Sequence, residues 1–280
     1  IKNLAVNTPN SEFGAVEYNG NLVFAGVKLK PGLFDKKFKW DNATYLNLVS
    51  IPLKNINSAD SIVNYFAQEL KTGMHESNAV FTKDGKTMYF TRNNSKNGTK
   101  KRDDKKISNL QIFKAELVEG KWTNITSLPF NSPNYSVEHP ALSADEKVLY
   151  FASDMPGTLG QSDLYKVKIN DDGTYGTPEN LGKGINTEGR ETFPFVTEKN
   201  ELYFASDGHP GLGGLDIFTG KISENGVSEI KNVGTDINSP QDDFGFSLNE
   251  KGGIAYLSSN RNKGLGSDDI YSIDQKMIIA

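Results

Sequence analysis

The chain has 280 residues, of which 36% are hydrophobic and 24% are charged, and its formal net charge is −4. This weak acidity gives no global electrostatic reason to bind nucleic acid or an anionic membrane surface. The sequence contains no cysteine, which excludes thiol catalysis, zinc–thiolate sites and disulfide bonds. No apolar run approaches the roughly 20 residues that a membrane-spanning helix needs.

Short strand patterns separated by polar turns follow one another along the chain. The first group pairs an aromatic-ended strand at 21–24 with a further strand at 47–53. Each later group has a strand, a polar turn, an aromatic strand and a third strand, and these groups lie at 77–117, 139–169, 192–222 and 244–275. Two strands joined by a short polar turn form a β-hairpin. The pattern predicts an all-β chain built from similar units.

The aromatic strand recurs with a nearly constant period. Its anchors Tyr89, Tyr150, Tyr203 and Tyr256 are 61, 53 and 53 residues apart. A four-stranded antiparallel unit repeated about every 50 residues predicts a β-propeller, because one blade alone cannot bury both of its faces. We therefore predict five blades. Six blades are the alternative, and they would require a degenerate copy within residues 55–75.

The two ends of the chain are predicted to form one blade together. The fifth copy ends after its third strand, near Asp274, and residues 3–12 resemble the fourth-strand segment at 180–191. We expect the N-terminal residues to supply the outer strand of the last blade, since this pairing removes an open sheet edge. The predicted single domain has blades at about 11–74, 75–135, 136–189, 190–241, and 242–280 plus 1–10.

A loop before each third strand ends in a polar side chain. It is glycine-rich in the last three copies, and the polar side chains are Asn47, Gln111, Asp163, Asp216 and Asp269. Glycine allows the positive φ of a tight connection, and a side-chain oxygen can accept backbone N–H bonds from the same loop. Because the group recurs in every copy, we interpret these residues as structural loop staples. A cation site at the aspartates is the alternative.

An acidic residue aligns near the start of the first strand in all five copies: Glu12, Glu76, Glu138, Glu191 and Asp243. The first strands of a propeller line its axis, so we expect these carboxylates around one mouth of the central channel. The favoured interpretation is hydrogen bonding to backbone amides that sets the blade register. We expect no cofactor. The alternatives are a Ca²⁺ ion at this mouth and glycoside hydrolysis by paired carboxylates, although repeated, similar environments do not separate two pKa values well.

Two copies carry long insertions between the second and third strands. The interval from the aromatic to the staple position is 12 residues in the last three copies, 21 in the second and 23 in the first. Both insertions are basic, and we predict partner-binding residues in them at Phe34, Phe38, Trp40, Lys100, Lys101 and Arg102. Exposed aromatic side chains among cations are typical of protein-binding surfaces. A solvated loop is the alternative.

The repeated sequence motifs E-x-x-P, Y-F-x-S-D/N and G-x-G-x-x-D-I-Y are clearest in residues 136–280. It resembles the WD40-like propeller repeats of OmpA-family periplasmic proteins from bacteria with type IX secretion. The resemblance implies a non-enzymatic scaffold in the periplasm, associated with the outer membrane, that binds other cell-envelope or secretion-system proteins. It implies neither nucleic-acid binding nor membrane insertion, and peptidoglycan contact only through domains outside this chain. A glycan- or peptidoglycan-binding domain and a propeller glycoside hydrolase remain the alternatives.

Overall fold

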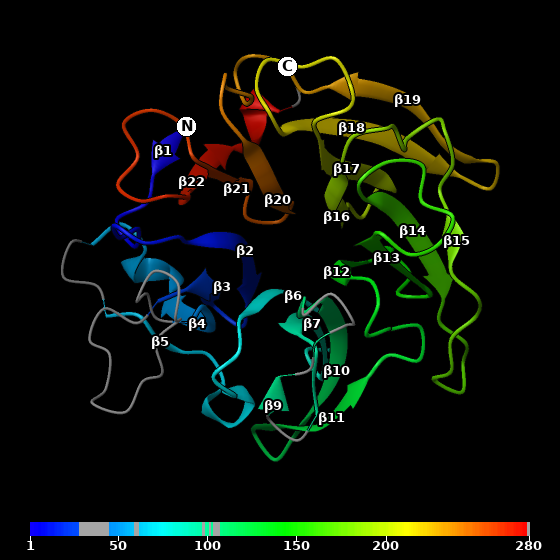
Figure 1. Cartoon of the computed structure of the whole chain (residues 1–280). Coiled ribbons are helices and arrows are strands. Elements are labelled where there is room, and N and C mark those ends of the chain that lie inside the picture. The colour runs from blue at the N-terminus through cyan, green and yellow to red at the C-terminus, as the bar shows by residue number, and fades with distance from the viewer. Residues whose placement is uncertain (28–44, 59–61, 97–98, 101, 103–106, 279–280) are drawn as a thin grey trace.

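The computed structural model describes all residues except 28–44, 59–61, 97–98, 101, 103–106 and 279–280. Figure 1 shows the strands grouped into sheets around a central axis. Five of these sheets have four strands each, and neighbouring strands in them are antiparallel. The helices of the described residues are short 3-10 helices: η1 (Leu53–Asn55), η2 (Gln68–Leu70) and η3 (Gln275–Met277).

The strands of each blade are given below in order from the central axis outward (Figure 1). Blade 1 consists of β2 (Phe13–Tyr18), β3 (Asn21–Gly26), β4 (Asn47–Pro52) and β5 (Asn64–Tyr65). Blade 2 consists of β6 (Glu76–Phe81), β7 (Thr87–Asn93), β10 (Leu110–Val118) and β11 (Lys121–Ser127). Blade 3 consists of β12 (Val137–Leu142), β13 (Val148–Ser153), β14 (Asp163–Lys168) and β15 (Glu179–Asn180).

The remaining two blades complete the ring. Blade 4 consists of β16 (Glu191–Val196), β17 (Glu201–Ser206), β18 (Asp216–Ser223) and β19 (Gly226–Asn232). Blade 5 consists of β20 (Asp243–Asn249), β21 (Ile254–Ser259), β22 (Asp269–Asp274) and the N-terminal strand β1 (Lys2–Asn3). In β1, Lys2 lies opposite Ser272 of β22. The predicted five blades and N-terminal closure are confirmed, and the described part of 55–75 contains β5 and η2 rather than a sixth blade.

The recurring Tyr-Phe pair explains how the blades pack. Successive residues of a strand point to opposite faces of its sheet, so each residue of the pair serves a different interface. Tyr150 joins the apolar cluster between blades 3 and 4, whereas Phe151 joins the cluster between blades 2 and 3. The five apolar clusters of the described residues each combine side chains from two neighbouring blades. The core is therefore a set of interblade layers.

An asparagine in the connection that leads to the next blade explains the repeated Ile/Val-Asn-Ser/Thr step. Asn186 donates its side-chain amide to the carbonyl of Leu164 and accepts the N–H of the same residue, at 3.0 and 2.8 Å. Asn7 makes the same pair of bonds with Ile270, at 2.8 Å each. These bonds satisfy backbone groups of a third strand where its short outer neighbour ends, so the asparagine extends the pairing of the sheet.

The inner strands β2, β6, β12, β16 and β20 each contain a β-bulge. Their register shifts lie at residues with positive φ: Gly14, Asn78, His139, Phe193 and Gly245. A bulge bends a strand and increases its twist, which suits a strand that curves around the channel. Because the bulges are equivalent, they give a reliable register for comparing residues between blades.

Candidate functional site

Four of the five predicted channel acids are buried. Glu12, Glu76, Glu191 and Asp243 stand at the start of inner strands and are each at most 2% exposed. Each accepts a hydrogen bond from the threonine or serine four residues earlier. For Glu191 the donors are the backbone N–H of Thr187 at 2.7 Å and its hydroxyl at 2.6 Å. These carboxylates are therefore hydrogen-bonded to the connections between blades.

Burial and ion pairs set the electrostatics of these acids. Desolvation raises the pKa of Glu12 and that of Glu76 to about 7. Glu76 is ion-paired with Arg92, whose Nε lies 3.2 Å from its carboxylate, and both side chains are nearly inaccessible. Asp243 is paired with Arg261. We call the channel end where the inner strands start the acid mouth.

Glu138 does not occupy the equivalent position, so its alignment with the other acids is wrong. Val137 pairs with Ser153 just as Glu191 pairs with Ser206 in blade 4. Val137 therefore replaces the acid in blade 3, because the stretch from Glu138 to its proline is one residue shorter than in blade 4. The Glu138 side chain is 18% exposed. Burial, and then the charge of Asp154, raise its pKa to about 7.

Aromatic side chains meet in the channel below the acid mouth. The ring of Phe193 lies 4.9 Å from that of Phe244 and 6.2 Å from that of Phe13. The His139 ring stacks on Phe193 at 3.6 Å, and its Nδ1 lies 2.7 Å from the hydroxyl of Thr192. Burial lowers the pKa of His139 to about 3, so this imidazole is neutral at physiological pH. The described residues contain no group of three or more His, Asp or Glu arranged to hold a metal ion, and the Ca²⁺ site stays a prediction.

The loop-staple residues fall into two kinds. Asp163, Asp216 and Asp269 each accept two backbone N–H bonds from the loop before them, for example Leu212 N–H to Asp216 at 2.7 Å. The two amides instead donate their side-chain N–H groups, Asn47 to the carbonyl of Tyr45 and Gln111 to that of Ser132. The carboxylate bonding pattern is thus found in blades 3, 4 and 5.

Most of the predicted partner-binding residues cannot be placed in the fold. Phe34, Phe38, Trp40 and Lys101 lie outside the described residues. Lys100 belongs to β9 (Thr99–Lys100), which pairs with β8 (Ser95–Lys96). Arg102 is exposed. The assignment of these residues to a binding surface stays a prediction.

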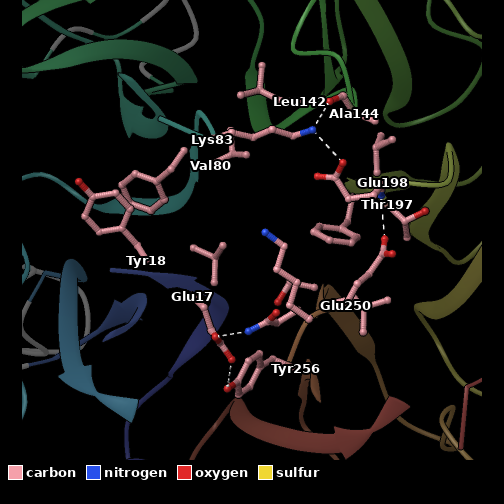
Figure 2. A pocket seen from close by; sticks show the side chains of 18 of the residues that line it. Glu17, Tyr18, Val80, Lys83, Leu142, Ala144, Thr197, Glu198, Glu250 and Tyr256 are labelled. Atoms are coloured by element: carbon pink, nitrogen blue, oxygen red, sulfur yellow. Dashed lines mark hydrogen bonds and ion pairs between the residues drawn. The ribbon is translucent and has the colours of Figure 1, made fainter. Parts of the chain in front are cut away.

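A pocket of about 550 Å³ opens at the opposite end of the channel. It is surrounded by the ends of the inner strands and by the turns that lead to the second strands, and we call this end the turn mouth. Figure 2 shows side chains from different blades projecting into it. Its apolar part is formed by aliphatic and aromatic side chains: Val16, Val80, Leu142, Val196, Leu248, Phe81, Phe195, Tyr18 and Tyr256. A smaller chamber of about 80 Å³ continues inward to the bulges.

Glu17 breaks the symmetry of this pocket. Its strand pairing with Leu22 makes it equivalent to an apolar residue in each other blade, namely Phe81, Leu142, Val196 and Leu248. Its two carboxylate oxygens accept hydrogen bonds from the hydroxyl of Tyr256, at 2.7 Å, and from the side-chain amide of Asn249. Both donors come from blade 5, so Glu17 is held in one orientation at the wall of the pocket (Figure 2).

The rim of the turn mouth is connected by polar contacts between blades. The ammonium group of Lys83 lies 2.8 Å from Glu198 and 2.6 Å from the carbonyl of Ala144, so it joins blades 2, 3 and 4. Glu250 accepts the N–H of Glu198 at 2.8 Å. Tyr18 donates its hydroxyl to the carbonyl of Gly85 at 2.8 Å, which links blades 1 and 2. These bonds fix the turns that shape the pocket.

The turn-mouth pocket was not predicted from the sequence. Its signal was present in the stretch Ala15-Val16-Glu17-Tyr18, where a carboxylate follows an apolar pair at a position that is apolar in the other copies. That comparison requires the bulge register, which sequence spacing alone did not provide.

Comparison with family models found no match, and comparison with curated proteins found no significant match. Among solved structures, the chain is similar to an α-L-arabinofuranosidase from Lactobacillus brevis, at 14% identity and a TM-score of 0.54, covering 96% of this chain and 90% of that one. A thermostable family-43 glycoside hydrolase matches at 11% identity and a TM-score of 0.55, covering 97% and 89%. A protein from Agrobacterium tumefaciens assigned as TolB matches at 14% identity and a TM-score of 0.50, covering 96% and 84%.

These similarities concern the fold. The chain also matches two puromycin-hydrolysing enzymes, of which it spans only 37% and 38%. The match to TolB supports a WD40-like propeller class, while membership of the OmpA family or of a type IX secretion system is not shown. The prediction of a non-catalytic scaffold that is not an enzyme is contradicted, because propellers of the same fold and length include glycoside hydrolases. No helix within the described ranges is long and apolar enough to cross a membrane.

Proposed function

We propose that this propeller binds a saccharide in the pocket at the turn mouth. The observation that carries the proposal is Glu17, a carboxylate fixed by two donors where every other blade has an apolar side chain. A volume of about 550 Å³ lies within the range of roughly 300–1,000 Å³ that small-molecule sites occupy. A sugar ring has an apolar C–H face and a polar hydroxyl edge, and the pocket offers both apolar walls and hydrogen-bonding groups.

The charge of the lining favours a neutral or cationic ligand. Four glutamates and two lysines line the pocket: Glu17, Glu146, Glu198, Glu250, Lys83 and Lys251. The excess of carboxylates repels phosphate groups and other anions. Carboxylate oxygens accept hydrogen bonds from sugar hydroxyl groups, and the stacked rings of Tyr18 and Phe81, 4.1 Å apart, add a flat apolar surface.

Hydrolysis of the bound saccharide is the second candidate function. Glycoside hydrolysis uses two carboxyl groups on either side of the scissile bond, and here carboxylates from blades 1, 3, 4 and 5 line one pocket. The two glycoside hydrolases of the same fold and length support this candidate. Glu17 would be one of the pair, and Glu198 or Glu250 of the neighbouring turns the other.

The test measures binding and cleavage with the same set of glycans. Calorimetric titration with arabinan, xylan and peptidoglycan oligosaccharides should find at least one ligand for the parent protein. Glu17→Gln should weaken that binding by about tenfold or more, since a hydrogen bond to a charged group contributes about 1.5–3 kcal/mol. The exposed Glu229→Gln variant in β19 is the matched control. Failure of every glycan to bind, or equal binding by both variants, would refute the proposal, and release of reducing ends would identify hydrolysis.

We also propose that the protein works in the periplasm, in association with the outer membrane. The resemblance of residues 136–280 to repeats of OmpA-family periplasmic proteins supports this location, as does the fold similarity to TolB. Fractionation of cells that express the full-length protein tests it. Recovery in the cytoplasmic fraction would contradict the proposal.

A further inference from the structure

Three leucines occupy equivalent places in the loops between the second and third strands of blades 3, 4 and 5. Leu159, Leu212 and Leu265 are 53 residues apart in sequence and are 42%, 48% and 62% exposed. None of them belongs to an interblade apolar cluster of the described residues. Their loops lie on the face of the acid mouth, because they end where the third strands begin. This face is opposite to the turn-mouth pocket.

The backbone of each leucine is held by the aspartate that follows it. The N–H groups of Leu159, Leu212 and Leu265 donate to Asp163, Asp216 and Asp269, at 2.8, 2.7 and 2.5 Å. These aspartates are at most 1% exposed. Each staple aspartate therefore closes its loop and also holds the backbone of a leucine whose side chain is exposed to solvent.

The glycine after each leucine packs against the neighbouring interblade connection. A Cβ atom added at Gly160, Gly213 or Gly266 would lie 2.4, 2.1 or 2.0 Å from a backbone oxygen of that connection. The loop is thus fixed on both sides of the leucine. Rigid presentation lowers the entropy lost when a partner binds, so these leucines are suited to act as anchors.

The loops and connections around the leucines are acidic. Segments 154–162, 181–190, 207–215, 233–242 and 260–268 contain six carboxylates and four basic side chains. Arg190 and Arg261 are already ion-paired, with Asp207 and Asp243 respectively. The charges of these described segments that are outside ion pairs are five carboxylates and two lysines: Asp154, Glu188, Asp236, Asp242, Asp268, Lys183 and Lys263.

We propose that these three loops form a docking surface for a basic polypeptide segment that carries apolar side chains. The leucines supply apolar contacts at three fixed points along an arc over blades 3 to 5, and the surrounding carboxylates attract Lys and Arg side chains of the partner. The same acidity opposes an anionic lipid surface. This surface lies on the opposite face of the propeller from the turn-mouth pocket.

The experiment uses synthetic peptides as probes, measured by fluorescence anisotropy. The first peptide alternates Lys and Leu, and two peptides of the same length alternate Lys with Ser and Glu with Leu. The protein variant carries Leu159→Ser, Leu212→Ser and Leu265→Ser. The matched control carries Val118→Ser, Ile125→Ser and Ile254→Ser, which are 47%, 38% and 36% exposed and lie outside the three loops. Thermal unfolding checks that both variants are folded.

The parent and the control should bind the Lys–Leu peptide, and the leucine variant should bind it at least about tenfold more weakly, because a few buried anchors dominate an interface. A charge variant, Glu188→Gln with Asp236→Asn, should also weaken binding, and added salt should weaken it further. The proposal is overturned if the parent does not bind this peptide, if the leucine variant binds it equally well, or if the Glu–Leu peptide binds as tightly.

Discussion

Replacement of Glu191 by alanine tests whether the buried acids stabilise the ring. Glu191 is fully buried and accepts three hydrogen bonds, from the N–H and hydroxyl of Thr187 and from the hydroxyl of Ser206, at 2.6–2.7 Å. The hydroxyl groups can rotate toward other acceptors, but the backbone N–H of Thr187 cannot. Losing charged hydrogen bonds and leaving a buried donor unsatisfied costs about 1–3 kcal/mol for each group. We expect Glu191→Ala to lower the free energy of unfolding by about 3–5 kcal/mol.

The measurement is thermal and urea unfolding followed by circular dichroism. A loss of about 3–5 kcal/mol corresponds to a melting temperature lower by roughly 5–9 °C in a chain of this size. Glu188→Ala, an exposed acid in the same connection, is the control and should change stability by at most about 0.5 kcal/mol. Equal stability of the two variants would refute the interpretation that these acids hold the connections between blades.

Three further predictions concern pH, the interblade connections and the core. The folded pKa of Glu138 is raised from 4.5 to about 7, so its contribution to stability is complete below pH 4.5 and is lost as the pH rises through 7. In the parent protein this lowers the free energy of unfolding by up to about 3 kcal/mol between pH 5 and 8, and Glu138→Gln should remove this decrease. Asn7→Ala removes both hydrogen bonds to Ile270 and should lower the free energy of unfolding in urea by about 2–4 kcal/mol. The control Asn64→Ala, at an exposed position, should leave that free energy unchanged. Phe151→Ala, at a fully buried site, should cost about 3–5 kcal/mol in the same assay.

Each of these predictions has a result that would contradict it. An unchanged pH profile for Glu138→Gln would mean that this carboxyl is solvated. Equal stability of the Asn7 and Asn64 variants would mean that water replaces the asparagine clamp. A loss below about 1 kcal/mol for Phe151→Ala would mean that the neighbouring blades close the cavity.

The repeat features that decide the fold were readable in the sequence. The Tyr-Phe pair at Tyr150 and Phe151 recurs because each blade has two faces to bury, and strand alternation directs one side chain to each neighbour. The match between residues 3–12 and 180–191 predicted the closing strand, because Asn7 and Asn186 make the same backbone bonds. A local pattern of this kind predicts the same strand and the same contact in each blade of a propeller.

The sites depended on information that local patterns do not contain. Glu138 was misaligned because it stands one residue later, relative to the bulge, than the acids of the other blades, and in a strand one residue exchanges the two faces. The sequence placed Glu12, Glu76, Glu191 and Asp243 near one channel mouth, with backbone hydrogen bonding as the favoured role, but it did not identify the donors. In the structure each acid accepts a bond from the threonine or serine four residues earlier. Only the folded chain shows which acids are already hydrogen-bonded.

The sequence by itself determined the number of blades, their strand order and the closure of the ring, since these follow from the period and the alternation of apolar residues. The tertiary structure decided where a ligand could bind. The turn-mouth pocket assembles Glu17 with Tyr256 and Asn249, which are more than 230 positions away in the chain. Such a site exists only after the ring has closed, because closure places the first blade beside the fifth.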